Sequence, residues 1–70
     1  MPNRECILDL IKAGASIDVT AKTFNVDILT EFAEAAAETG TQLIIPGNLS
    51  NDMLLRVVVA GRGSVTVKYL

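Results

Sequence analysis

The sequence predicts an α/β fold: three helix–strand repeats that form a short solenoid, with a three-stranded parallel sheet and the helices on one face. Helical spacing and strand-like alternation follow each other three times along the 70 residues. The segments "NRECIL", "NVDILT" and "SNDMLL" begin at residues 3, 25 and 50, and each joins a capping Asn or Ser to an acid and two large apolar residues. A glycine stands shortly before each predicted strand.

The first unit is a helix followed by a short strand. "NRECILDLIKA" has helical spacing and Gly14 follows it as a stop, whereas "SIDVT" alternates apolar and polar residues as a half-buried strand does. One helical face collects Cys6, Ile7, Leu10 and Ile11. We therefore expect Cys6 to be a packed core thiol, because the chain has no histidine to activate it.

The second unit repeats this order. "NVDILTEFAEAAAET" has an apolar side and ends at Gly40, which suits a C-terminal cap. The apolar side consists of Ile28, Leu29, Phe32 and Ala36. "QLIIP" is the second strand, and the turn "PGN" closes it. "IPGNLS" could hold an anion where Ser50 opens the next helix, but capping of that helix explains the segment without a ligand.

The third unit contains the ambiguous stretch "VVVAGRG". Three consecutive valines favour a strand, and a β-hairpin of "LRVVV" against "SVTVKYL" is the alternative. Ser50, Asp52 and the match to the other two units favour a helix that Gly61 stops. The glycines then lie between a helix and a strand, so they are a cap and a turn. A phosphate loop needs them between a strand and a following helix.

Strict alternation predicts which face of the sheet the helices cover. We expect Ile17, Val19, Leu43, Ile45, Val65 and Val67 to pack against Ile7, Leu10, Leu29, Phe32, Leu54 and Val57. The open face would then present Ser16, Asp18, Thr20, Gln42, Ile44, Ser64, Thr66 and Lys68.

The chain is expected to be one domain, residues 1–70, with units at about 1–20, 23–46 and 48–70. It resembles leucine-rich-repeat proteins of the helix-and-strand type, since "LIIPGN" fits the family pattern L-x-L-x-x-N with Leu43, Ile45 and Asn48. The first unit has Lys22 where the Asn belongs, and the third ends at Leu70. The resemblance implies a topology and a role as an interaction scaffold, and it implies no binding residues.

Composition argues against several functional classes. With no histidine there is no Ser-His or Cys-His pair, so we expect no enzyme activity, no metal site and no cofactor. A net charge of −2 and three aromatic residues argue against nucleic-acid binding. The apolar runs are too short for a membrane span, and one cysteine without a secretory signal suggests a cytoplasmic protein.

One charged feature falls on the second helix. Steps of four, three and four residues place its acids in one stripe, which consists of Asp27, Glu31, Glu34 and Glu38. We expect this stripe to be a solvated outer face. A docking patch for a basic partner is the alternative, and it would suit a small acidic inhibitor or immunity-type protein that occludes one macromolecule.

Apolar surplus predicts self-association as the leading function. Half of the residues are hydrophobic, which is high for so small a chain, and the third helix is apolar nearly all round. A repeat stack also needs polar caps, and neither end has one. The predicted interface consists of Leu8, Ile11, Leu55, Val58, Val59 and Leu70. Head-to-tail stacking into a ring or filament and a two-fold dimer are both open. An anion- or nucleotide-binding domain is a third hypothesis.

Overall fold

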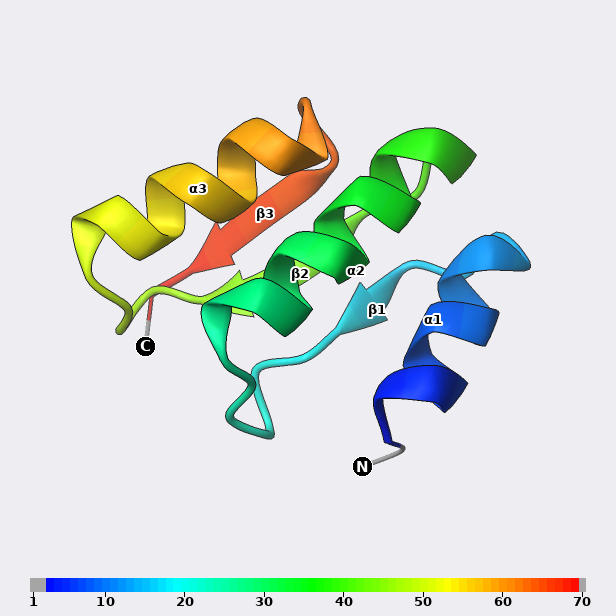
Figure 1. The fold of residues 1–70 in the computed structure, drawn as a ribbon, viewed down its shortest axis with the longest axis horizontal. Coiled ribbons are helices and arrows are strands. Elements are labelled where there is room, and N and C mark those ends of the chain that lie inside the picture. Colours follow the sequence, from blue (N-terminus) through cyan, green and yellow to red (C-terminus); the bar gives the residue numbers. More distant parts are fainter. Residues whose placement is uncertain (1–2, 70) are drawn as a thin grey trace.

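The computed structural model describes residues 3–69, and within them three helices alternate with three strands (Figure 1). The elements are α1 (Arg4–Lys12), β1 (Ile17–Asp18), α2 (Val26–Thr39), β2 (Leu43–Pro46), α3 (Asn51–Gly61) and β3 (Val65–Lys68). The predicted α/β class and the order of its elements are therefore confirmed.

Each helix begins where the sequence places a capping side chain. The side chains of Asn3, Asn25 and Ser50 accept hydrogen bonds from backbone amides three residues later, at Cys6, Ile28 and Met53. An acid follows in the first turn of every helix, where it faces the positive end of the helix dipole. The shared start signature is thus a set of three N-caps.

The three strands form one parallel sheet in the order β1-β2-β3. Ile17 lies opposite Leu43, and Leu43 lies opposite Val65, so the strands are aligned with one another. The helices cover one face of the sheet, with α2 between α1 and α3 (Figure 1). Because β3 pairs in parallel with β2 and residues 51–61 are helical, the hairpin alternative is wrong.

The core lies between the sheet and the helices, as the alternation predicts. Its largest fully buried side chains are Phe32, Ile7, Ile11, Leu29, Leu43, Ile45, Val19 and Val57. Ile17, Val65 and Val67 pack against this core but are only partly buried. They belong to the two edge strands, which have a neighbour on one side only.

Helix α1 turns a different face to the core from the one predicted. Ile7 and Ile11 are buried, but Leu10 is 45% exposed and Cys6 is exposed as well. Successive helical residues are about 100° apart, so Cys6 and Leu10 lie to one side of Ile7 and Ile11. That side faces away from α2, and no described helix covers it. The expectation of a packed Cys6 thiol is therefore wrong.

Gly61 does not stop α3 in the way the sequence suggests. It is the last helical residue, and Arg62 instead takes the left-handed cap conformation, with φ 46°. Gly61 is buried where α3 passes over β3, and a Cβ there would collide with the side chain of Val65. The position needs glycine for close packing. Gly40, by contrast, caps α2 in the left-handed conformation as predicted.

Candidate functional site

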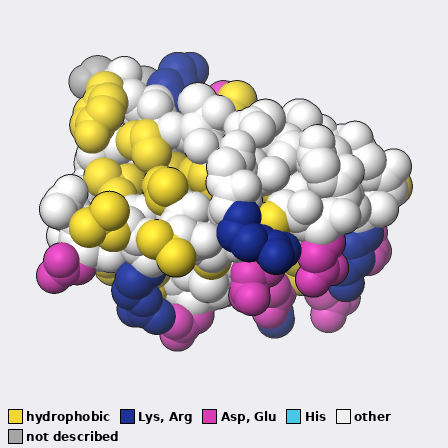
Figure 2. Space-filling view, turned by 90° about the horizontal axis from the view of Figure 1, so that it is seen from above, with side chains coloured by type: hydrophobic (Ala, Val, Ile, Leu, Met, Phe, Trp, Pro, Cys, Tyr) yellow, Lys and Arg dark blue, Asp and Glu magenta, His cyan; other side chains and the backbone are white. Residues whose placement is uncertain are grey.

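The outer flank of α3 is the most exposed apolar helix surface among the described residues. Leu54, Val57 and Gly61 point into the core. Leu55 and Val59, one turn apart, are 53% and 71% exposed. A shallow depression of about 420 Å³ lies beside them, lined by Thr30, Leu55, Arg56, Val59 and Ala60. Figure 2 views the molecule from above, the side on which α3 and β3 lie, and hydrophobic side chains gather on the left of this view.

The outer edge of β3 lies next to this flank. Leu43 N donates to Ser64 O and Gly47 N donates to Lys68 O, so the backbone groups of the even-numbered residues of β3 point towards β2. In a parallel ladder the backbone groups of the residues between them point to the opposite side of the strand. The backbone groups of Val65 and Val67 therefore point to an edge that no strand within residues 3–69 pairs with. We call Leu55, Val58 and this edge the C-terminal end face. Val59 points away from the sheet, as Lys12 and Glu34 do at the same distance from their caps, so it borders this face.

The opposite end of the sheet has a similar construction. Cys6 and Leu10 are exposed on the outer flank of α1. Ile17 N donates to Gln42 O and Val19 N donates to Ile44 O, so the backbone of Asp18 points to the other free edge. We call Cys6, Leu10 and the outer edge of β1 the N-terminal end face.

The six residues that the sequence assigns to the interface do not all lie at the surface in the structure. Leu55 is exposed and Val58 is partly buried, both on the C-terminal end face, and the exposed Val59 borders that face. Leu8 is partly buried beside α2, and Ile11 is only 1% exposed, so its side chain is core and cannot reach another molecule. Leu70 lies outside the described residues. Sequence reasoning missed Leu10 and Cys6, because it assigned both to the core face of α1.

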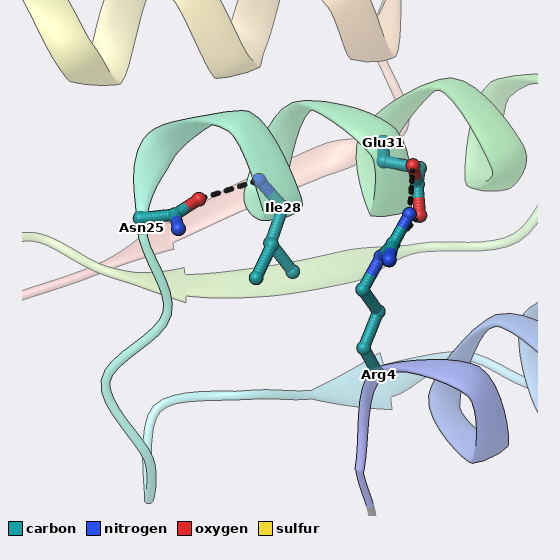
Figure 3. A network of polar contacts seen from close by, with 4 residues as sticks. All are labelled: Arg4, Asn25, Ile28 and Glu31. Atoms are coloured by element: carbon teal, nitrogen blue, oxygen red, sulfur yellow. Dashed lines mark hydrogen bonds and ion pairs between the residues drawn. The ribbon is translucent and has the colours of Figure 1, made fainter.

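The acidic stripe of α2 is partly a seam between helices. Arg4 donates two hydrogen bonds to Glu31, from Nε to Oε1 at 2.8 Å and from Nη2 to Oε2 at 2.7 Å (Figure 3). Arg56 of α3 lies 3.5 Å from Asp27. Two of the four acids thus bind cations on the neighbouring helices. The stripe is therefore not only a solvated face, as the sequence predicts, but also a contact between helices.

A groove of about 470 Å³ follows the seam between α1 and α2. Its lining consists of Arg4, Leu8, Lys12, Glu31, Glu34, Ala35 and Glu38. Two cations stand here against three carboxylates, so the groove has mixed charge. A surface of this kind has little electrostatic preference for a basic partner over an acidic one.

Glu34 tests whether the remaining acids are merely solvated. Glu34→Gln is expected to change the free energy of unfolding by about 0.5 kcal/mol or less, as is usual at exposed positions. The sign can be favourable, because Glu34 and Glu38 repel each other at i, i+4. Urea denaturation of both proteins measures the difference. A loss well above this value would mean that the stripe is buried or bound.

The Arg4–Glu31 pair predicts a dependence of stability on pH. Hydrogen bonds from Arg4 hold the pKa of Glu31 below its ordinary value of 4.5, and those from Thr20 likewise lower the pKa of Asp18. The unfolded chain therefore binds these protons first as the pH falls. The stabilisation is complete at a pH above the ordinary pKa values of the two carboxyl groups. It is lost as the pH falls through their lowered pKa values in the folded protein.

We expect the free energy of unfolding to fall from neutral pH towards about pH 3, and Glu31→Gln to flatten that decline. Urea denaturation at a series of pH values measures both slopes. Glu34→Gln is the matched control, because Glu34 lies on the same helix and forms no ion pair among the described residues. Equal slopes for Glu31→Gln and the parent would contradict the assignment.

A smaller crevice of about 140 Å³ lies at the carboxyl ends of β1 and β2. It is lined by Thr20, Lys22, Thr23, Phe24, Leu29, Pro46, Asn48 and Leu49. The adjoining helix starts are capped by Asn25 and Ser50, as the sequence predicts. The Lys22 ammonium lies 5.4 Å from the centre of the Phe24 ring. Because the chain's own side chains occupy cap amides, capping accounts for these helix starts without an anion.

The open face of the sheet is a polar ladder. Gln42 links all three strand ends: its backbone amide donates to Ser16 Oγ at 3.1 Å, and its side chain accepts from Thr66 Oγ1 at 3.0 Å. Its side-chain amide also donates to Gly63 O at 3.2 Å. These groups bind one another at one end of the face, and the described residues of the face present no converging set of reactive groups.

The described part of the chain also lacks two other kinds of feature. No set of three or more cysteine and carboxylate side chains in residues 3–69 is arranged to hold a metal ion. None of the helices seen in these residues has the length and apolar character needed to cross a bilayer. Comparison with known proteins gives no match to this chain among family models, curated proteins or solved structures.

Proposed function

We propose that this chain is a non-enzymatic protein-interaction module that associates with copies of itself through the two ends of a short α/β solenoid. The observation that supports this most directly is the C-terminal end face. Leu55 stands largely in solvent, with Val59 one turn further on, beside a parallel strand edge that no strand in residues 3–69 pairs with. Apolar side chains next to unsatisfied backbone groups are a typical site for another chain to add.

A second copy is the simplest partner, because both ends have the same construction. Each consists of an exposed apolar helix flank beside a free parallel edge. The weak topological resemblance to leucine-rich-repeat proteins fits an interaction role. The absence of histidine from the sequence leaves Cys6 and the serines without the usual base, which favours a role other than catalysis. A lone thiol suits a reducing compartment such as the cytoplasm.

The alternative, an acidic inhibitor that occludes one basic macromolecule, has less support. Asp27 and Glu31 bind cations of the chain itself, at Arg56 and Arg4. The groove beside Glu34 and Glu38 also contains Lys12. Two of the four acids of the stripe are therefore paired within the chain before any partner binds.

Light scattering over a concentration series tests the proposed function. We expect the parent to have a mass above that of the monomer, and Leu55→Glu with Val59→Glu to shift it towards the monomer. Two buried charges without partners would oppose the contact strongly. Circular dichroism shows whether the variant keeps its fold.

Ala21→Glu with Thr23→Glu is the matched control. It adds the same charge at exposed positions of the loop between β1 and α2. We expect this control to associate as the parent does. A parent that stays monomeric at high concentration, or a Leu55/Val59 variant that associates like the parent, would refute the proposed function.

A further inference from the structure

We infer that the two end faces bind each other head to tail, so that β3 of one copy pairs in parallel with β1 of the next copy. Helix α1 of the next copy then packs beside α3 and buries Leu10. This inference rests on the proposed function and specifies its geometry. The partner is a second copy of this chain, and the contact surface on that copy is the N-terminal end face.

The first argument comes from equivalent positions of the three helices, counted from the caps Asn3, Asn25 and Ser50. The seventh residue after the cap is Leu10, Phe32 or Val57. Phe32 and Val57 are fully buried in helices that follow another helix, whereas Leu10 is largely exposed in the first helix. Within residues 3–69 no unit precedes α1, so Leu10 is not covered as its two equivalents are.

The same count gives the converse result at the other end. The eighth residue is Ile11, Ala33 or Val58, and it is buried in α1 and α2 but only partly buried in α3. The fifth residue is Leu8, Thr30 or Leu55, and it is exposed only in α3. Within residues 3–69 no unit follows α3 to cover these positions. Each end of the described structure has the exposed flank that the other end of a second copy would cover.

The second argument comes from the backbone ladder. Amides of inward-facing residues donate to the next strand: Ile17 N to Gln42 O, and Leu43 N to Ser64 O. Continuing this register places Ile17 of the next copy opposite Val65, as Ile17 lies opposite Leu43 within the chain. Val65 N and Val67 N then donate to Ser16 O and Asp18 O of the next copy. Both free edges gain partners in the ladder that the sheet already uses.

Charge on the open face fits the same register. Asp18 of the next copy comes opposite Thr66, so it becomes a diagonal neighbour of Lys68 on the adjoining strand. Within one copy, β2 lies between Lys68 and Asp18, so their charges act on each other only across that strand. Diagonal neighbours are within reach of a long side chain, so the junction brings together an exposed cation and an exposed carboxylate.

One pair at the junction opposes association. The sixth residue after the cap contacts the start of the preceding helix: Glu31 binds Arg4, and Arg56 binds Asp27. The sixth residue of α1 is Asp9, which would lie beside Asn51 and Asp52 of the preceding copy. Two carboxylates there repel, so the stack is weakened at this point, and a cation at position 9 would copy the Arg56–Asp27 pair.

Single-cysteine variants test the register, with Cys6→Ser removing the native thiol. Ser16 and Ser64 stand one residue before the aligned Ile17 and Val65. Within one copy β2 lies between β1 and β3, so Ser16 and Ser64 are about 9–10 Å apart, too far for a disulfide. In the head-to-tail junction they lie on adjacent strands. We therefore expect a disulfide-linked dimer when Ser16→Cys and Ser64→Cys proteins are mixed, and none from either protein alone.

Other outcomes distinguish the failures. If Ser64→Cys alone forms the dimer, two β3 edges meet about a two-fold axis and the inference is wrong. If no mixture cross-links while light scattering shows assembly of the same proteins, association uses another surface; the proposed function then survives and the head-to-tail register does not. If the parent is monomeric, the proposed function fails as well.

Asp9→Arg gives an independent test by strengthening the contact. We expect it to lower the concentration of half-assembly by about two- to fivefold, the range of an exposed ion pair. Glu38→Arg is the matched control, because it makes the same charge change at an exposed position away from both end faces. A weaker or unchanged assembly for Asp9→Arg, or an equal gain for Glu38→Arg, would contradict the placement of α1 beside α3.

Discussion

Phe32→Ala is expected to lower the free energy of unfolding by about 3–5 kcal/mol, the range for removing a fully buried aromatic ring. Phe32 has no exposed surface and lies at the centre of the core between the helices and the sheet. Its ring also meets Phe24 edge to face, with centroids 5.3 Å apart and planes at 80°. A domain of this size has a total stability of roughly 4–10 kcal/mol, so this single change removes much of it.

Phe32→Leu is the matched comparison, because it keeps an apolar side chain and leaves a smaller cavity. We expect it to cost clearly less than Phe32→Ala. Urea denaturation of the three proteins at one fixed concentration measures the differences, and the fixed concentration matters because association is coupled to unfolding. If Phe32→Ala costs no more than about 1 kcal/mol, the ring is not at the centre of the core.

Local signals were sufficient to predict the elements and their order. Asn3, Asn25 and Ser50 are capping residues by chemistry alone, and each one starts a helix in the structure. The comparison of the three units also identified Val57–Val59 as helical, although valine favours strands. Here a repeated pattern outweighed the intrinsic preference of a short segment.

Burial on α1 could not be predicted in the same way, because it depends on which neighbour covers each flank. The sequence shows an apolar set at Cys6, Ile7, Leu10 and Ile11, and only tertiary packing decides that Ile7 and Ile11 are covered. The Arg4–Glu31 pair has the same origin, since 27 residues separate its members.

Only part of the candidate interface could therefore be predicted from the sequence. Leu55 and Val59 stood out because an amphipathic helix has a polar side and α3 has apolar residues there, and the structure places both in solvent. Leu8 and Ile11 were assigned to the facing surface as a flank of α1, but that flank is the one α2 covers. The exposed flank of α1 is on the opposite side, at Cys6 and Leu10.

Gly61 also depends on tertiary contact, and it supplies the second large effect. Gly61→Ala would raise helix propensity by about 1 kcal/mol if α3 were isolated. In the structure the new Cβ would collide with a methyl group of Val65, which belongs to a stiff side chain on β3. We therefore expect a net loss of about 1–3 kcal/mol in the free energy of unfolding, the usual cost of overpacking.

A double-mutant cycle with Val65→Ala isolates this contact. Removing the methyl groups of Val65 leaves the Cβ atoms of Ala33 and of residue 65, both at 3.4 Å, as the nearest neighbours of the added methyl. In that background we expect Gly61→Ala to be neutral or stabilising, because the propensity gain remains and the collision is gone. Urea denaturation of the four proteins gives a coupling energy, expected to exceed about 1 kcal/mol. Additive effects would mean that α3 is not held against β3 at this point, and that glycine serves the chain turn at Arg62 instead.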